Sequence, residues 1–197
     1  MQVLVSGQQI DVSDALRRQI DARLHSGIGK YFDNPIDAHV AFSREGREFR
    51  VVCSVHVGHD LYAQAQASGD EIQTIFEQAA DRLESRLRRY KRRLRGHRGR
   101  ERPASEELRA KSYVLEAASE HEEAPEEFQP VIVAENLSDI IGRTVGEAVM
   151  QLELADLPAL MFRNPGNGHL NVVYRRPDRH IGWIDLVATE PDADDGF

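Results

Sequence analysis

The sequence is poor in cysteine, in long apolar runs and in any leader-like segment at its start. Cys53 is the only cysteine among 197 residues, so a disulfide within the chain is impossible and a zinc or iron–sulfur site built on cysteines is disfavoured. No segment approaches the roughly 20 apolar residues that a membrane span needs. Residues 1–7 place no basic region before a long apolar stretch, which argues against a signal peptide. We therefore expect a soluble, cytoplasmic protein with no membrane partner.

The sequence also lacks the motifs that carry catalysis or hold a cofactor. It contains no H-E-x-x-H, G-x-S-x-G or P-loop motif. His56 and His59 lie three residues apart, but the pattern offers no third ligand and no metal site is expected. Cys53 alternates with valines, which indicates a buried small side chain rather than a nucleophile. The sequence therefore predicts no enzyme, no cofactor, no metal and no small-molecule substrate.

Positive charge is scarce overall but concentrated in one segment. The 25 Lys and Arg residues against 33 Asp and Glu give a net charge of −8, which would disfavour a nucleic-acid partner if it were spread evenly. Residues 1–102 are instead net +4, whereas residues 103–129 and 130–197 are each net −6. Residues 82–102 contain eleven basic residues and only two acidic ones. A chain divided in this way must be interpreted segment by segment.

Two breaks in composition predict two folded domains joined by a linker. Gly96–Pro103 is unsuited to continuing a helix, and Pro125–Pro130 follows a stretch rich in Ala, Ser and Glu. We expect a first domain at residues 1–102, an acidic flexible linker at 103–129 and a second domain at 130–197. The linker contains few large apolar residues, and a transient helix around Glu106–Ala118 is left open.

Hydrophobic periodicity in the first domain predicts the element order β-α-β-β-β-α. Alternating side chains indicate strands at Gln2–Ser6, Ile36–Ser43, Phe49–Val57 and Leu61–Ser68. Apolar spacings of three and four indicate one helix after Ser13 and a long helix that runs through Leu94. Ser68 and Glu71 form a predicted capping box at the start of the long helix. We expect an α+β sandwich, in which two helices cover one face of a four-stranded sheet.

The second domain is predicted to be a small α+β unit. Val131–Ala134 is a candidate strand, and Thr144 with Glu147 forms a capping box before a short helix. Three more strands are expected at Ala159–Arg163, Leu170–Arg175 and Ile181–Val187. Their apolar side chains present more surface than one short helix can cover, which is typical of a domain that completes its core by dimerising.

The charged residues in the second half of the long helix of the first domain are almost all positive. Glu84 is the only acidic residue between Arg82 and Arg95, whereas exposed helices usually mix charges because like charges repel. Polyphosphate offsets this repulsion through counterion release and bidentate arginine contacts. We therefore expect the helix to bind the backbone of structured RNA through Arg82, Arg86, Arg88, Arg89, Lys91, Arg92, Arg93 and Arg95. The alternative is a solvated face, or one that docks a protein.

Several segments resemble the long form of the ribosome hibernation promoting factor family. These segments are Tyr31–Asp33, Ala63–Asp70, Tyr90–Leu94, Pro158–Asn164 and Asn171–Asp178, together with Gly182. The resemblance implies an N-terminal domain that binds the small ribosomal subunit and its rRNA, in the channel used by mRNA and tRNA, and so inhibits translation under stress or in stationary phase. It also implies a C-terminal domain that forms a homodimer and joins two ribosomes.

The resemblance assigns residues to both activities. It implies RNA contacts from Lys30 together with Arg82, Arg86, Arg89, Lys91, Arg92 and Arg93. It implies contacts across the C-terminal homodimer from Phe162, Val172, Tyr174, Ile181 and Trp183. Gly27 and Gly29 stand where charged residues are common in the family, so the first helix is expected to add little to RNA binding. The alternatives are a general structured-RNA-binding protein or RNA chaperone with a self-associating tail, and a module whose basic face docks an acidic protein.

Overall fold

The computed structural model describes residues 1–58, 61–96, 108–116 and 131–186, apart from the side chain of Arg95. The first part of the described chain contains β1 (Gln2–Gln8), α1 (Asp14–Gly29), β2 (Asp37–Glu45), β3 (Glu48–Gly58), β4 (Leu61–Gly69) and α2 (Ile72–Gly96). The rest contains β5 (Leu108–Leu115), β6 (Ile132–Ile140), α3 (Val145–Leu154), β7 (Ala159–Arg163), β8 (Leu170–Arg175) and β9 (Ile181–Asp185).

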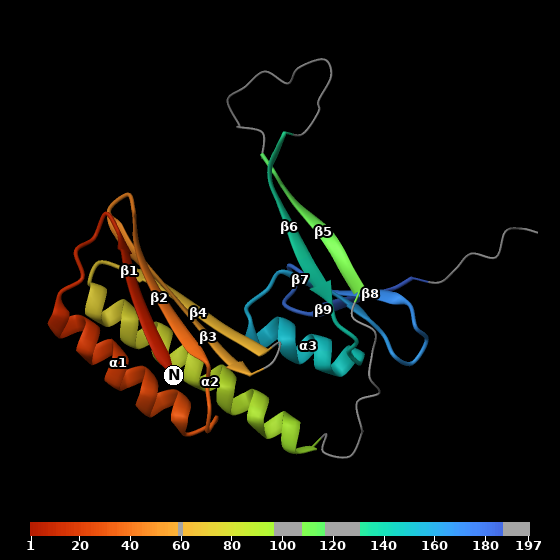
Figure 1. The fold of residues 1–197 in the computed structure, drawn as a ribbon, viewed down its shortest axis with the longest axis horizontal. Coiled ribbons are helices and arrows are strands. Elements are labelled where there is room, and N and C mark those ends of the chain that lie inside the picture. The colour runs from red at the N-terminus through yellow and green to blue at the C-terminus, as the bar shows by residue number, and fades with distance from the viewer. Residues whose placement is uncertain (59–60, 97–107, 117–130, 187–197) are drawn as a thin grey trace, which may run out of the picture.

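The N-terminal domain is a four-stranded sheet in the order β1-β2-β3-β4 with α1 and α2 on one face (Figure 1). β1 pairs with β2 in parallel, and the other two pairs are antiparallel. Gly46 has a φ of +65° in the turn between β2 and β3, a left-handed conformation that glycine adopts without steric cost. The predicted β-α-β-β-β-α sandwich is confirmed.

The core of this domain lies between the sheet and the two helices. Alternate residues of β2, β3 and β4 are buried there, as Val40, Val51 and Cys53 illustrate, and α2 adds Phe76 and Leu87. β1 contributes only partly buried side chains. Burial raises the pKa of the Cys53 thiol to about 12, so the thiol stays protonated and unreactive at neutral pH. The prediction that Cys53 is a packed side chain is confirmed.

The start of α2 differs from the sequence-based prediction. Ser68 was expected to cap the helix, but it belongs to β4 and pairs with Arg50 of β3. The chain turns after Gly69, and the carbonyl of Glu71 accepts the amide of Ile75 at 3.1 Å in the first helical turn. Ser68 stays in β4 because the pairing of β4 with β3 extends to Gly69. A residue held in the strand in this way is not available to cap the helix.

The C-terminal domain packs α3 against one face of the antiparallel sheet β7-β8-β9. Thr144 and Glu147 form the predicted capping box: the Thr144 hydroxyl accepts the Glu147 amide at 3.3 Å, and the Glu147 carboxylate accepts the Thr144 amide at 2.9 Å. β7 and β8 have the predicted bounds, and β9 ends two residues earlier than expected. The small α+β unit is confirmed.

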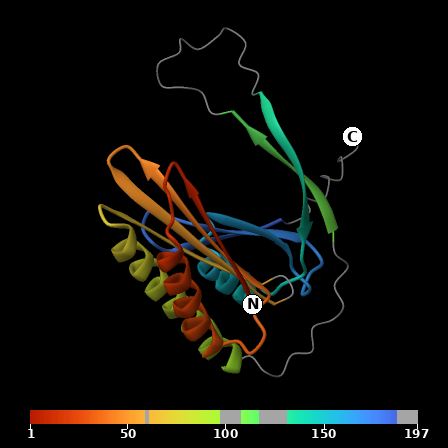
Figure 2. The same ribbon diagram turned by 60° about the vertical axis from the view of Figure 1, so that its left-hand side comes forward.

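Part of the predicted linker is a strand. Leu108–Leu115 forms β5 and pairs with β6 in an antiparallel ribbon that extends away from both sheets (Figure 2). The pairing brings Lys111 within 2.8 Å of Glu135 and places Tyr113, Val114 and Leu115 in extended backbone. The prediction of a linker gave more weight to the acidic average composition of the segment than to these β-favouring side chains. Because Leu108–Leu115 is a strand, the transient helix that was left open there is wrong. Residues 103–107 and 117–129 of the predicted linker lie outside the described residues.

The two domains contact each other through α3. α3 lies beside the edge strand β4 and beside α2, and Leu154 at its end belongs to the N-terminal core (Figures 1 and 2). Gln151 of α3 donates a 3.3 Å hydrogen bond to the Tyr62 carbonyl of β4. Within the described ranges, no helix combines the length and the apolar character needed to cross a bilayer.

Candidate RNA-binding and dimerisation surfaces

The basic residues of α2 lie on two sides of its buried stripe. Because successive side chains of a helix are about 100° apart, residues at steps of three and four share one side. Arg82, Arg86, Arg89 and Arg93 form the β4 flank, next to the sheet edge and α3. Arg88, Lys91 and Arg92 form the α1 flank, next to the end of α1. We define the exposed cluster as Arg88 and Arg92 of the α1 flank together with Arg89 of the β4 flank, all three of which are exposed.

The β4 flank is partly engaged within the protein. Arg82 donates to the Gln66 carbonyl and Arg86 to the Gln64 carbonyl. Both carbonyls belong to β4, which is an edge strand, so these arginines cover backbone groups that a second strand could otherwise pair with. Arg86 and Arg93 also form ion pairs with Asp156 and Glu153 at the end of α3. These two predicted RNA contacts therefore have protein partners in this structure.

The α1 flank lines an open groove of about 290 Å³. Lys30 and Tyr31, at the end of α1, form one wall, and Arg88, Lys91 and Arg92 of α2 form the other. The Lys91 ammonium donates a 2.6 Å hydrogen bond to the Tyr31 carbonyl, as expected for a cation near a helix C-terminus. Four cations around one groove favour an anionic occupant such as a phosphate.

Glu84 joins α1 to α2 below this groove. Its carboxylate accepts hydrogen bonds from Arg23 at 3.3 Å and from Lys30 and Tyr31 at 3.2 Å. Burial by itself raises the pKa of Glu84, but the hydrogen bond and charge of Lys30, with the hydrogen bonds from Tyr31 and Arg23, outweigh burial and hold the pKa below its ordinary value. A Cβ at Gly27 would lie 2.8 Å from the Arg23 guanidinium, so glycine leaves room for this cluster.

Replacing Glu84 by glutamine is expected to lower the free energy of unfolding by about 1–2 kcal/mol at pH 7, because three donors lose a charged acceptor. The pKa of Glu84 is lower in the folded than in the unfolded chain, so this contribution is complete above the ordinary pKa of 4.5 and is lost as pH falls through the folded value. Urea unfolding curves at pH 7, and in steps below pH 4.5, test the expectation.

The matched control for this prediction is Asp139→Asn, which removes an exposed carboxylate 3.8 Å from Arg109 on the ribbon. Its effect should stay below about 0.5 kcal/mol at every pH, as is usual for exposed ion pairs. A Glu84→Gln deficit that persisted undiminished in acid would contradict the assignment.

The chemistry of the surface is that of charge recognition. Tyr90, which lies among the arginines of α2, is partly buried against the core, with its ring centroid 6.5 Å from that of Phe32. The prediction that Tyr90 is a core residue is confirmed, and it is not placed to stack on a base. Among the residues that the structure describes, no three His, Cys, Asp or Glu side chains gather as a metal site would require. The arrangement therefore suits contacts with a phosphate backbone rather than base reading.

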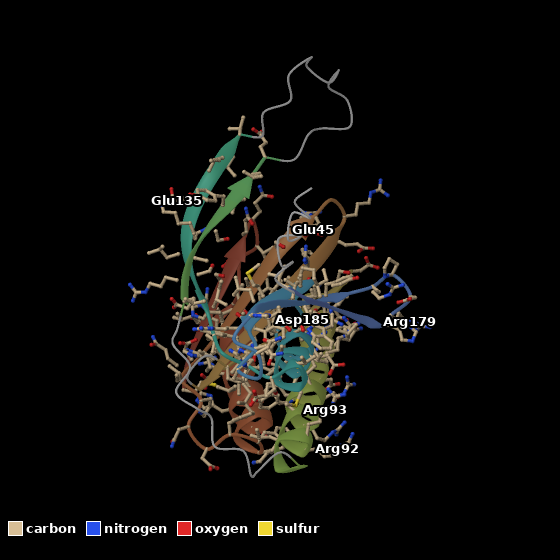
Figure 3. The ribbon with its side chains drawn as sticks, turned by 90° about the vertical axis from the view of Figure 1, so that its right-hand side faces the viewer. Glu45, Arg92, Arg93, Glu135, Arg179 and Asp185 are labelled. Carbon is tan, nitrogen blue, oxygen red and sulfur yellow. The ribbon has the colours of Figure 1, made fainter. Side chains whose placement is uncertain are left out.

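The predicted RNA contacts are thus brought together in one region of α2, with two qualifications. Arg92 and Arg93 lie near the same end of the helix but belong to different flanks (Figure 3). Lys30 joins the α1 flank from α1, although its ammonium also pairs with Glu84. The side chain of Arg95 lies outside the described residues. Sequence reasoning missed the acidic residues Glu153 and Asp156, because nothing local links them to a helix 60 or more residues earlier.

The five residues predicted to contact a second copy do not share one side of the C-terminal sheet. Phe162 is fully buried against α3 with Val173 and Leu152, so its side chain belongs to the domain's core and is not exposed to a second copy in this structure. Ile181 and Trp183 fall on the same side as Phe162 by register. Successive side chains of a strand point to opposite faces of the sheet, which explains why the five residues lie on two sides.

Val172 and Tyr174 point to the opposite side of the sheet, which we call the outer face. Met161, Val172 and Ile184 lie directly across from one another on β7, β8 and β9. Met161 and Ile184 are each about half exposed (47% and 49%). A Cβ at Gly182 would lie 2.3 Å from the Tyr174 ring, so glycine allows that ring to lie across β9. Met161 and Ile184 were missed, although the alternation in β7 and β9 could have identified them.

Trp183 is held on the α3 side by a buried polar residue. Asn171 is fully buried, and its side-chain oxygen accepts a 2.8 Å hydrogen bond from the Trp183 indole. Its amide nitrogen donates to Asp185 at 2.8 Å. The segment Asn171–Asp178, one of those that resemble the family, thus begins with a buried amide whose hydrogen bonds are made by its neighbours.

The sequence matches two parts of one known protein family. Residues 3–95 match the family described as Sigma 54 modulation protein / S30EA ribosomal protein, and residues 127–182 match the C terminus of that family. The first match covers the N-terminal sandwich with both basic flanks, and the second covers β6, α3, β7, β8 and the first two residues of β9. β5 lies between the two matched regions.

Full-length relatives agree with these matches. A ribosome hibernation promotion factor from Rhizobium meliloti (strain 1021) is 38% identical over 187 residues, covering 95% of this chain and 98% of that protein. One from Bradyrhizobium diazoefficiens is 34% identical over 202 residues and all of both chains. A solved ribosomal subunit interface protein from Coxiella burnetii matches 47% of this chain and 99% of its own, with 25% identity and a TM-score of 0.41. By its full-length similarity, this chain belongs to the ribosome hibernation promotion factor family.

Proposed function

We propose that this protein binds the small ribosomal subunit in the channel used by mRNA and tRNA, and that it inhibits translation from there. Membership of the family supports ribosome binding and hibernation as the general role. The observation that carries the finer proposal is the exposed cluster, Arg88, Arg89 and Arg92, on a helix whose opposite side is anchored in the core. Because packing already orders the helix, its exposed arginines can meet rRNA phosphates without the backbone first having to fold.

The C-terminal domain is proposed to pair with a second copy through its outer face. Met161 and Ile184 are exposed on a sheet whose other side already packs on α3. Apolar side chains in a row across three strands gain most when another apolar surface removes them from water. Two chains paired in this way, each bound to a ribosome, would hold two ribosomes together.

Binding to purified small subunits at rising KCl concentration tests the first proposal. With about four phosphate contacts, the affinity should fall roughly tenfold for each doubling of KCl, because each contact releases counterions. Cosedimentation with small subunits, large subunits and free double-stranded RNA at one salt concentration identifies the partner.

The comparison between partners separates this proposal from its rivals. Binding to small subunits that exceeds binding to free RNA supports it. Equal binding to both would favour a general RNA-binding protein or chaperone. Binding that survives nuclease treatment and ignores KCl would favour a protein partner instead.

A further inference from the structure

The end of α3 places two carboxylates against the basic β4 flank of α2. Asp156 Oδ1 lies 2.9 Å from Arg86 Nη2, and Glu153 forms an ion pair with Arg93. Asp156 also lies 3.4 Å from Arg175, so one carboxylate links α2 to the C-terminal sheet. The side chains of Arg86 and Asp156 are only 24% and 20% exposed. The two carboxylates therefore occupy positions where RNA phosphates would otherwise meet these arginines.

The backbone at Asp156 adopts a conformation that costs more for an aspartate than for a glycine. Asp156 has a φ of +54°, in the left-handed region that follows many helix ends. Glycine would adopt this conformation without a steric cost, whereas an aspartate bears that cost and gains contacts with Arg86 and Arg175. The local conformation is thus consistent with a carboxylate that is required at this position.

The contact between α3 and the N-terminal domain is packed but incompletely satisfied. Met150, Leu154 and Ala155 are buried. Gln151 donates to the Tyr62 carbonyl, yet its own side-chain oxygen is buried with no hydrogen-bond partner in the described part of the chain. An unpaired buried acceptor opposes the contact, because it loses its hydrogen bonds to water. A contact with both favourable and unfavourable parts can open when a ligand binds one side of it.

We propose that α3 is an internal competitor for RNA: its carboxylates cover Arg86 and Arg93 in the free protein, and the small subunit displaces them. This proposal rests on the proposed function and adds a closed and an open state to it. Only the exposed cluster and the α1 flank are available for a first encounter in the closed state. Full engagement of the β4 flank requires α3 to leave.

Opening would couple the two domains. The closed contact fixes the C-terminal domain against β4, so its displacement by RNA frees that domain to move. By linkage, whatever favours the open state also favours binding to the subunit, and the measured dissociation constant rises as the open fraction falls.

The first test removes the charges of the competitor without changing its shape. Glu153→Gln with Asp156→Asn should bind small subunits about tenfold more tightly than the wild type. The matched control, Glu135→Gln with Asp139→Asn, makes the same charge change and also removes two ion pairs, on the ribbon away from α2 (Figure 3). Equal affinities for the two double variants would overturn the proposal, because general charge would then explain any gain.

The second test observes the contact itself. The substitutions Gln78→Cys on α2 and His180→Cys after β8, both at exposed positions, allow a donor and an acceptor dye to be attached, since Cys53 is buried. An excess of unlabelled chain suppresses energy transfer between copies. Transfer efficiency should fall when small subunits are added, and it should already be lower in the Glu153→Gln, Asp156→Asn variant alone.

The outcomes separate this proposal from the one on which it rests. Failure of the wild type to bind small subunits would refute the proposed function. Subunits that bind while transfer efficiency stays unchanged would refute the opening of α3. An unchanged efficiency in the free double variant would refute the claim that its carboxylates hold the closed state.

Discussion

Reversing the charge of the exposed cluster, with Arg88→Glu, Arg89→Glu and Arg92→Glu together, is expected to weaken binding to the small subunit by at least about 100-fold. Each charge-assisted contact contributes on the order of 1 kcal/mol or more, and a loss of about 3 kcal/mol is a factor of roughly 100. The slope of log affinity against log salt should fall as well, because fewer counterions are released. Equilibrium binding to fluorescent small subunits at several KCl concentrations measures both quantities.

The choice of these three arginines follows from their surroundings. Arg86 and Arg93 pair with α3, so reversing them would disrupt the domain contact as well as any RNA contact, and the result would be ambiguous. A matched control carries the same three charge reversals at Arg44, near the end of β2, and at Arg47 and Arg179, which lie in turns; all three are exposed and none belongs to α2. The control should retain affinity within about threefold. Equal losses in both variants would show that net charge, rather than the helix surface, governs binding.

The basic surface could be predicted because it depends on a single helix. Steps of three and four between arginines fix their sides relative to the buried stripe, whatever the helix packs against. The Thr144 cap was predictable for the same reason, since its partner Glu147 is three residues away. Ser68 offered the same local signal, yet the pairing of β4 with β3 determined its conformation. Local rules succeed where no long-range pairing competes for the same residues.

The parts that could not be predicted depend on contacts between distant segments. Arg86 and Asp156 are 70 residues apart, and only the docking of α3 beside β4 brings their charges to 2.9 Å. β5 becomes a strand because β6 supplies a partner, although its own segment has a linker-like composition. The family resemblance assigned Phe162 to the dimer contact, and the strand pattern could not test this, because it identifies two faces without saying which one α3 covers. Such outcomes require knowledge of the tertiary arrangement.

Introducing Met161→Glu with Ile184→Glu on the outer face should abolish ribosome pairs while leaving binding to single ribosomes within about twofold. The two residues lie on either side of Val172 in one row across the sheet, so a second copy packed there would bury both carboxylates. Burying an unpaired charge in an apolar contact costs several kcal/mol, which is more than a 100-fold loss in pairing. Sucrose gradients of ribosomes mixed with the variant would show single ribosomes only.

Two comparisons make this result specific to the outer face. Leu4→Glu with Ile36→Glu places the same charges on exposed apolar positions of the N-terminal domain and should leave ribosome pairs intact. Phe162→Ala would also remove the pairs, but by unfolding, because truncating a fully buried phenylalanine costs about 3–5 kcal/mol in a small core. Circular dichroism distinguishes the cases, since the outer-face variant should keep its thermal transition. Ribosome pairs that persist with Met161→Glu and Ile184→Glu would place the dimer contact elsewhere, with the ribbon of β5 and β6 as the next surface to test.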